Sequence, residues 1–99
     1  MLAFTPKERM LDAQGRPYFL WDCDMTDSTF RELLVDPDPD VRATVISKLM
    51  RQAKPDDVFQ YVDLDTVLAH WEPIQKNLGR RRDFWNWIVP LWTANRRAR

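Results

Sequence analysis

The 99-residue sequence is poor in the residues that build many known sites. It has one cysteine, one histidine and only two glycines. One cysteine cannot form an internal disulfide, and together with one histidine it leaves too few ligands for a structural zinc site. Two isolated glycines cannot make the glycine-rich loop that cradles phosphate groups. We therefore expect no disulfide framework, no metal and no cofactor.

Long hydrophobic runs are also missing. The longest stretch without a charged residue, Phe84–Asn95, has twelve residues and contains a proline, whereas a membrane-spanning helix needs about 20 apolar residues. The N-terminal residues lack the basic and apolar segments of a secretory signal. We therefore expect a cytoplasmic protein with no membrane partner.

The formal net charge is zero, but the charges are unevenly distributed. Residues 22–40 carry seven acids and one base, and residues 76–99 carry seven bases and one acid. Such polarity is typical of a partner-binding surface, or of two segments that face each other in the fold. The sequence leaves both interpretations open.

The remaining composition predicts an all-α protein. No run alternates cleanly between apolar and polar residues, and the hairpin turns that glycine favours are missing. The seven prolines fall where helices would start or stop. We predict one small bundle of four to six short helices over residues 17–99, preceded by an extended, weakly ordered arm at residues 1–16.

Capping residues and prolines place the predicted helices along the chain. Thr26 and Asp38 are good N-caps for the first two confident helices, and Pro39 suits the first helical position. Asp63 can cap a later helix, which Pro73 is expected to interrupt. The last helix is predicted to span about residues 81–95, with Pro90 kinking or shortening it.

The apolar run Tyr18–Trp21 comes before these helices. It is too short for an α-helix, and we expect it to enter the core as an extended segment. Asp22 follows this run directly. We expect its carboxylate to accept hydrogen bonds from backbone N–H groups or from an arginine inside the fold.

Two tryptophans in the last helix cannot face the same way. Trp85 and Trp87 are two residues apart, about 200° around a helix. Trp87 belongs to the predicted buried stripe, which comprises Phe84, Trp87, Ile88, Leu91 and Trp92. Trp85 is therefore expected to be more exposed, either as an interface anchor or packed against the N-terminal arm.

Arg80, Arg81 and Arg82 stand at the start of this helix, and Arg96, Arg97 and Arg99 follow its end. Three arginines at a helix N-terminus oppose the helix macrodipole, which is consistent with an acidic partner. A solvated helix start followed by a frayed tail is the alternative interpretation. Together with Trp85 they could also hold nucleic acid, although the zero net charge argues against a general nucleic-acid binder. We therefore take Arg80, Arg81, Arg82 and Trp85 as candidate binding residues.

Catalytic chemistry has little support. Cys23 and His70 could form a nucleophilic pair only if the fold brought them together. Most of the paired aspartates fall at predicted helix starts, where capping explains them. The spacing of Asp36, Asp38 and Asp40 opens like a calcium loop, but that loop needs a glycine and a glutamate where this chain has Val41 and Ser47. A small hydrolase is the weakest of three hypotheses.

Two resemblances to known proteins add to this interpretation. Residues 34–49, with the turn Asp36-Pro37-Asp38-Pro39-Asp40-Val41-Arg42, resemble a single HEAT-type helical repeat, which predicts a helix–turn–helix pair and no solenoid. Residues 17–92, from the opening Pro17-Tyr18-Phe19-Leu20-Trp21-Asp22 to the closing Trp85-Asn86-Trp87-Ile88-Val89-Pro90-Leu91-Trp92, resemble a family of small uncharacterised bacterial proteins. Its members are often encoded beside nucleotidyltransferases of the abortive-infection toxin type.

This second resemblance implies a function but no catalytic residues. It implies a non-enzymatic, antitoxin-like accessory protein that binds a nucleotidyltransferase. A small nucleic-acid-binding module that uses the C-terminal arginines is the alternative, and a homodimer is left open.

Overall fold

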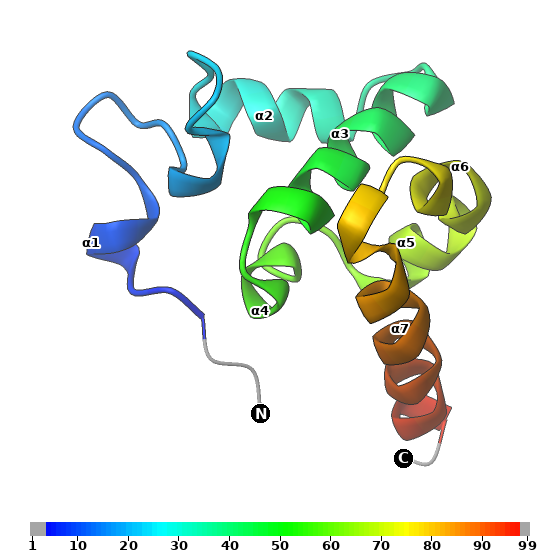
Figure 1. Ribbon diagram of the computed structural model, residues 1–99. Helices are drawn as coiled ribbons and strands as arrows, with labels where there is room; N and C mark the ends of the chain where they lie inside the picture. Colours follow the sequence, from blue (N-terminus) through cyan, green and yellow to red (C-terminus); the bar gives the residue numbers. More distant parts are fainter. Residues whose placement is uncertain (1–3, 98–99) are drawn as a thin grey trace.

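The computed structural model describes residues 4–97, and the side chains of residues 4–94 (Figure 1). Within these residues the chain forms seven α-helices and two 3-10 turns and no named strand, which confirms the predicted all-α class. The elements in chain order are α1 (Lys7–Met10), η1 (Tyr18–Leu20), α2 (Asp27–Leu34), α3 (Pro39–Gln52), α4 (Pro55–Val58), α5 (Leu64–Ala69), α6 (Trp71–Lys76), η2 (Gly79–Arg81) and α7 (Arg82–Arg97). None of the described helices is long and apolar enough to cross a membrane.

Three helices begin where their capping residues predict. The side chains of Thr26, Asp38 and Asp63 each accept a backbone N–H from the first turn of α2, α3 and α5, at 2.8–3.3 Å. Each cap satisfies one of the N–H groups that a helix start leaves without a partner. The helix–turn–helix pair α2–α3 is therefore positioned by local sequence.

Helix α3 lies at the centre of the fold and contacts α2, α4, α6 and both 3-10 turns (Figure 1). Ser47 is fully buried on it, and its hydroxyl donates to the Ala43 carbonyl at 2.7 Å and lies 3.3 Å from the Ile74 carbonyl of α6. This small side chain lets α6 approach α3 closely. The buried residues of α3 are Ala43, Val45, Ile46, Ser47, Leu49 and Met50.

The aromatic run Tyr18–Trp21 differs from its prediction. It forms the 3-10 turn η1 instead of an extended segment. Phe19 and Leu20 are buried as expected, and the Phe19 ring packs edge-on against Phe30 at 5.4 Å, but Trp21 is 77% exposed. Consecutive side chains in a 3-10 turn point about 120° apart, so the four residues cannot all enter one core.

Asp22 also differs from its prediction. Its carboxylate lies at the surface, 2.8 Å from the Lys48 ammonium and 3.3 Å from the Gln52 amide nitrogen of α3. The hydrogen bonds from these two side chains lower the pKa of Asp22 below its ordinary value. The partner is a lysine on the surface and not an arginine inside the fold.

The break before α6 falls at His70, three residues before Pro73. Proline has no N–H, so a continuous helix could not form the bond from residue 73 back to the carbonyl of Ala69. Ending α5 at Ala69 and restarting at Trp71 places Pro73 in the first turn of α6, where no N–H is needed. Pro73 therefore interrupts the helix, as predicted, but the break lies three residues before the proline.

Gly79 turns the chain from α6 toward α7. Its φ of +56° lies in the left-handed region, which glycine adopts readily, and no atom lies within 4 Å of an added Cβ. Gly79→Ala should therefore lower the free energy of unfolding only by the backbone strain, about 1 kcal/mol. Urea denaturation measures this difference, and an unchanged midpoint would contradict the left-handed conformation.

Candidate protein-binding surface

Helix α7 buries Trp85 and Val89, which the predicted stripe did not include, and only part of that stripe. Of the stripe, Phe84, Ile88 and Trp92 are partly buried against the core, whereas Trp87 and Leu91 are exposed. Trp85 is fully buried and Val89 nearly so, and the Trp92 ring packs against Phe59 with centroids 4.7 Å apart. Trp87, which the stripe predicted to be inside, is 62% exposed. The prediction of an exposed Trp85 is wrong, and Trp85 is removed from the candidate binding residues.

A hydrogen bond explains why Trp85 is buried in place of Trp87. The Trp85 indole N–H donates to the Met50 carbonyl near the C-terminal end of α3, at 2.9 Å. That carbonyl lacks its helical donor, because the N–H of Lys54 donates to the Tyr18 hydroxyl at 2.8 Å instead. Trp85 thus fills the core and satisfies an unpaired acceptor. Spacing alone cannot reveal such a bond.

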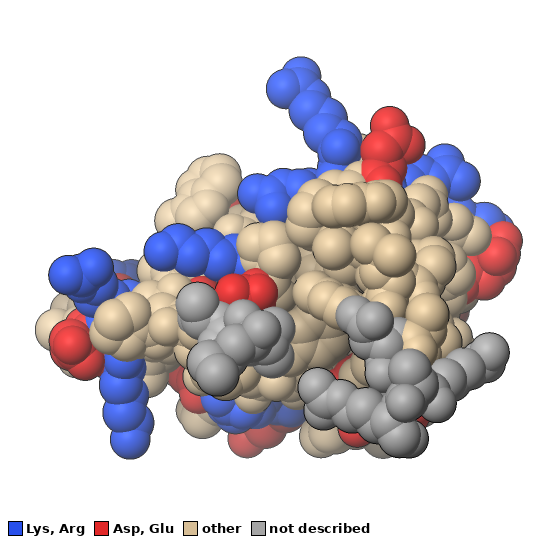
Figure 2. Space-filling view, turned by 90° about the horizontal axis from the view of Figure 1, so that it is seen from below, with Lys and Arg blue, Asp and Glu red and all other residues tan. Residues whose placement is uncertain are grey.

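The remaining apolar side of α7 is partly at the surface, because Trp87 and Leu91 are exposed while Phe84 and Ile88 are partly buried against the core. We call Phe84, Trp87, Ile88 and Leu91 the outer face of α7. Leu91 is 45% exposed, one turn after Trp87, and the Phe84 ring packs edge-on against Trp87 at 6.3 Å. Figure 2 shows an uncharged area on the molecular face that it draws, with Lys, Arg, Asp and Glu side chains at its border. Contiguous exposed apolar side chains rimmed by charge are typical of a protein-binding surface.

The arginine cluster, Arg80, Arg81 and Arg82, stands at the N-terminal end of α7. Arg80 and Arg81 end η2, and Arg82 is the first residue of α7. All three are exposed, and none of their side chains forms a hydrogen bond or ion pair with any described residue. They add positive charge to the positive end of the α7 dipole. The arginine cluster therefore lies at the N-terminal end of α7, with Arg82 on the Asn86 side of the helix and not on the side of Trp87 and Leu91. Arg99 and the side chains of Arg96 and Arg97 lie outside the described residues.

The acidic segment does not neutralise the arginine cluster within the described chain. The ion pairs of residues 22–40 are with Arg16, Arg31 and Lys48, at 2.8–3.0 Å. No described ion pair joins residues 22–40 to residues 76–94. The two segments therefore present separate charged surfaces, so the basic one is available to an acidic partner.

The proposed nucleophilic pair is not assembled. Arg42 Nε donates to His70 Nε2 at 3.4 Å, and His70 Nδ1 lies 3.0 Å from the Thr66 carbonyl, so both ring nitrogens have protein partners. Cys23 lines a depression together with Leu11 and Trp21, among others, and His70 does not line it. The part of the chain that the structure describes contains no group of three or more metal-ligating side chains.

One carboxylate that the sequence analysis treated as a helix-start residue is buried. Asp57 accepts hydrogen bonds from the Thr5 N–H at 2.7 Å, the Thr5 hydroxyl, the Tyr18 hydroxyl at 2.6 Å and the Gln60 amide at 3.1 Å. Burial raises the pKa of Asp57, but these hydrogen bonds outweigh burial and hold the pKa below its ordinary value. Burial and the bond to Asp57 raise the pKa of Tyr18 to about 12.

Asp57 therefore fastens the N-terminal arm to α4. All its hydrogen-bond donors are neutral groups of the protein itself, so its surroundings are those of a structural anchor. No sequence signal separates Asp57 from its neighbour Asp56, because the donors come from residues 52 and 39 positions away.

No protein-family model, curated protein or solved structure matches the chain. The resemblance to accessory proteins of nucleotidyltransferases is not tested by these comparisons and stays a prediction.

Proposed function

We propose that this chain is a non-enzymatic accessory protein that binds an acidic protein partner through the outer face of α7. The observation that carries the proposal is the exposure of Trp87 on a helix whose other face already supplies Trp85 to the core. Exposed tryptophans beside other apolar side chains are frequent anchors of protein interfaces. The free arginine cluster at the same end of α7 supports a partner with carboxylates around its contact.

The sequence resemblance supplies the first candidate partner. It implies a nucleotidyltransferase of the abortive-infection toxin type, which the chain would inhibit by covering part of its surface. In this antitoxin-like mechanism the chain contributes no catalytic residue. Its task is to bury Trp87 and Leu91 against the enzyme.

Nucleic acid is the second candidate, because an exposed Trp87 near three arginines could stack a base and contact phosphates. A protein is favoured by the rest of the outer face. Leu91 is an exposed aliphatic side chain one turn after Trp87, and it offers neither charge nor a hydrogen bond to a base or a phosphate. Fifteen acids also balance fifteen bases over the whole chain.

A symmetric homodimer through α7 is disfavoured by charge. If two copies paired their α7 helices in parallel, the two arginine clusters would meet. If the helices ran antiparallel, each cluster would face the end of the other helix, where the sequence carries Arg96 and Arg97. Like charges repel in both arrangements.

Capture of the partner from native cell extract tests the proposal. Tagged chain is used with and without nuclease, beside the variant Trp87→Ser. We expect a stoichiometric protein that survives nuclease, identified by mass spectrometry as a nucleotidyltransferase. Its recovery should fall about tenfold with Trp87→Ser, because an interface anchor of this kind contributes that much or more.

Trp21→Ser is the matched control. Trp21 is 77% exposed, against 62% for Trp87, but it directly follows η1 in the N-terminal half of the chain, so its replacement should leave recovery unchanged. Equal recovery with Trp87→Ser and wild type would contradict the outer face as the binding surface. Capture that nuclease and high salt abolish would favour the nucleic-acid alternative.

A further inference from the structure

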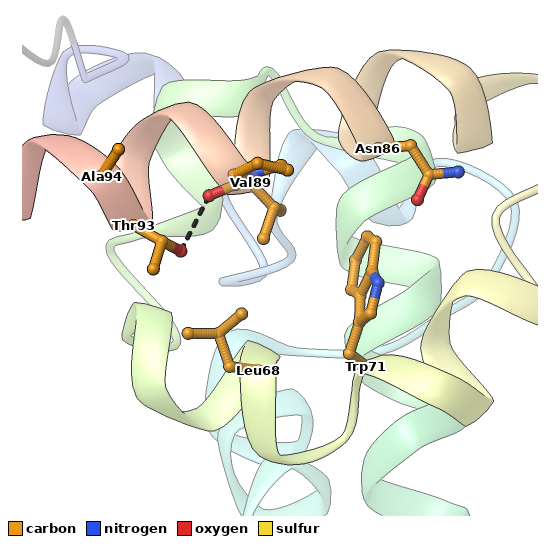
Figure 3. Close-up of a pocket in the computed structure, with 7 residues that line it drawn as sticks. Leu68, Trp71, Asn86, Val89, Thr93 and Ala94 are labelled. Atoms are coloured by element: carbon orange, nitrogen blue, oxygen red, sulfur yellow. Dashed lines mark hydrogen bonds between the residues drawn. The ribbon is translucent and has the colours of Figure 1, made fainter.

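A groove runs along the other exposed side of α7, between that helix and the α5–α6 pair (Figure 3). It encloses about 370 Å³, within the range of known ligand sites. Figure 3 shows the Trp71 indole rising from α6 toward α7 at the Asn86 end of the groove. The lining residues are Leu68, Trp71, Asn86, Val89, Pro90, Thr93 and Ala94.

One end of the groove is polar and has free hydrogen-bonding groups. Neither the Asn86 carboxamide nor the Trp71 indole N–H has a partner among the described residues. Pro90 has no N–H, so the Asn86 carbonyl also lacks its usual helical donor four residues on. These groups together offer three N–H donors and two acceptor oxygens, to which a peptide backbone can bind.

The other end of the groove is apolar. Leu68 is 38% exposed there and lies opposite Val89 and Thr93 (Figure 3). The Thr93 hydroxyl already donates to the Val89 carbonyl at 2.9 Å. An apolar side chain of a ligand fits this end, because the lining offers no free hydrogen-bond donor there.

A cation marks the polar end. Arg82 precedes Asn86 by four residues and so lies on the same side of α7, about 6 Å away along the helix axis. It is exposed, and no described residue pairs with it. From Arg82 to Ala94 the helix rises about 18 Å, the length of five or six extended residues.

We infer that this groove binds an extended segment of a partner protein that carries a carboxylate followed by an apolar side chain. The carboxylate pairs with Arg82, the backbone amide with Asn86 and Trp71, and the apolar side chain packs against Leu68. The inference rests on the proposed function, because Pro90 and Ala94 are helix neighbours of Trp87 and Leu91 and make the groove continuous with the outer face. An RNA strand fits less well, since Arg82 is the one cation on the described groove side of α7 and stands at its end.

A displayed library of random heptapeptides tests the groove without knowledge of the partner. We expect the peptides selected on the wild-type chain to share an acid placed before an apolar residue. Their affinity should fall about tenfold with Asn86→Ala and again with Arg82→Ala, both of which change exposed side chains and leave the fold intact. The matched control is Arg51→Ala, an exposed arginine of α3, which should leave affinity unchanged.

The outcomes separate this inference from the proposed function. Selection of no such peptides, or peptides that bind Asn86→Ala and Arg82→Ala as well as wild type, would overturn the groove and leave the outer face standing. Suppose that the peptides bind through the groove and that partner capture is the same with Trp87→Ser as with wild type. This pair of results would support the groove and overturn the outer face as the binding surface. Peptides whose binding follows Trp87→Ser but not Asn86→Ala would place the peptide contact on the outer face and overturn the groove.

Discussion

Replacing Trp85 by alanine is expected to lower the free energy of unfolding by about 4 kcal/mol. The substitution empties a fully buried site of its largest side chain, a change that costs about 3–5 kcal/mol in protein cores. It also leaves the Met50 carbonyl without its donor. Because small domains are stable by only about 5–15 kcal/mol, this is a large fraction of the total. Guanidinium denaturation followed by circular dichroism measures the loss.

Trp87→Ala is the matched comparison on the same helix. Trp87 is 62% exposed, so we expect a change within about 1 kcal/mol. If Trp85→Ala does not fold, Trp85→Phe keeps an aromatic ring but removes the N–H, and it should lose about 1–2 kcal/mol. A larger loss from Trp87→Ala than from the Trp85 variants would show that α7 is rotated relative to this structure.

The second large effect is expected at Asp57. Asp57→Ala removes the acceptor for the Thr5, Tyr18 and Gln60 donors, and donors left buried without a partner cost about 1–3 kcal/mol each. Some of these groups will reach water when the arm detaches, so we expect a loss of about 3 kcal/mol. Faster hydrogen exchange at the Thr5 N–H would show that the arm has been released. Glu32→Ala, at an exposed carboxylate of α2, is the control and should change stability little.

The contribution of Asp57 should depend on pH with a defined sign. Its folded pKa is lowered, so the unfolded chain takes up its proton first as pH falls. The stabilisation is therefore complete above the unfolded pKa of about 3.9 and is lost as pH falls through the lower, folded pKa. The difference in unfolding free energy between wild type and Asp57→Asn should be constant from pH 7 to 5 and shrink below about pH 4. A difference that grows on acidification would contradict this anchor.

Local signals predicted the helices that begin with a cap. Each capping side chain, at Thr26, Asp38 and Asp63, accepts a backbone N–H no more than three residues away. The local sequence is therefore enough to predict where these helices begin. The left-handed Gly79 belongs to the same class. The all-α class followed from the scarcity of glycine and the missing alternation.

Contacts between distant residues account for what the sequence could not predict. The orientation of α7 depends on the bond from Trp85 to Met50, 35 residues away, and no spacing rule distinguishes it from the stripe that contains Trp87. The burial of Asp57 likewise depends on Thr5 and Tyr18. The arginine cluster is evident from the sequence. Whether Trp85 or Trp87 is exposed is not, because that depends on how α7 is rotated about its own axis.

Oxidation of tryptophan by hydroxyl radicals, resolved residue by residue by mass spectrometry, tests the outer face most directly. We expect Trp21 and Trp87 to react in the free chain, while Trp85 is protected. In the captured complex Trp87 should become protected and Trp21 should react as before. A stoichiometric complex in which Trp87 remains as reactive as in the free chain would contradict the assignment of the outer face of α7 as the partner-binding surface.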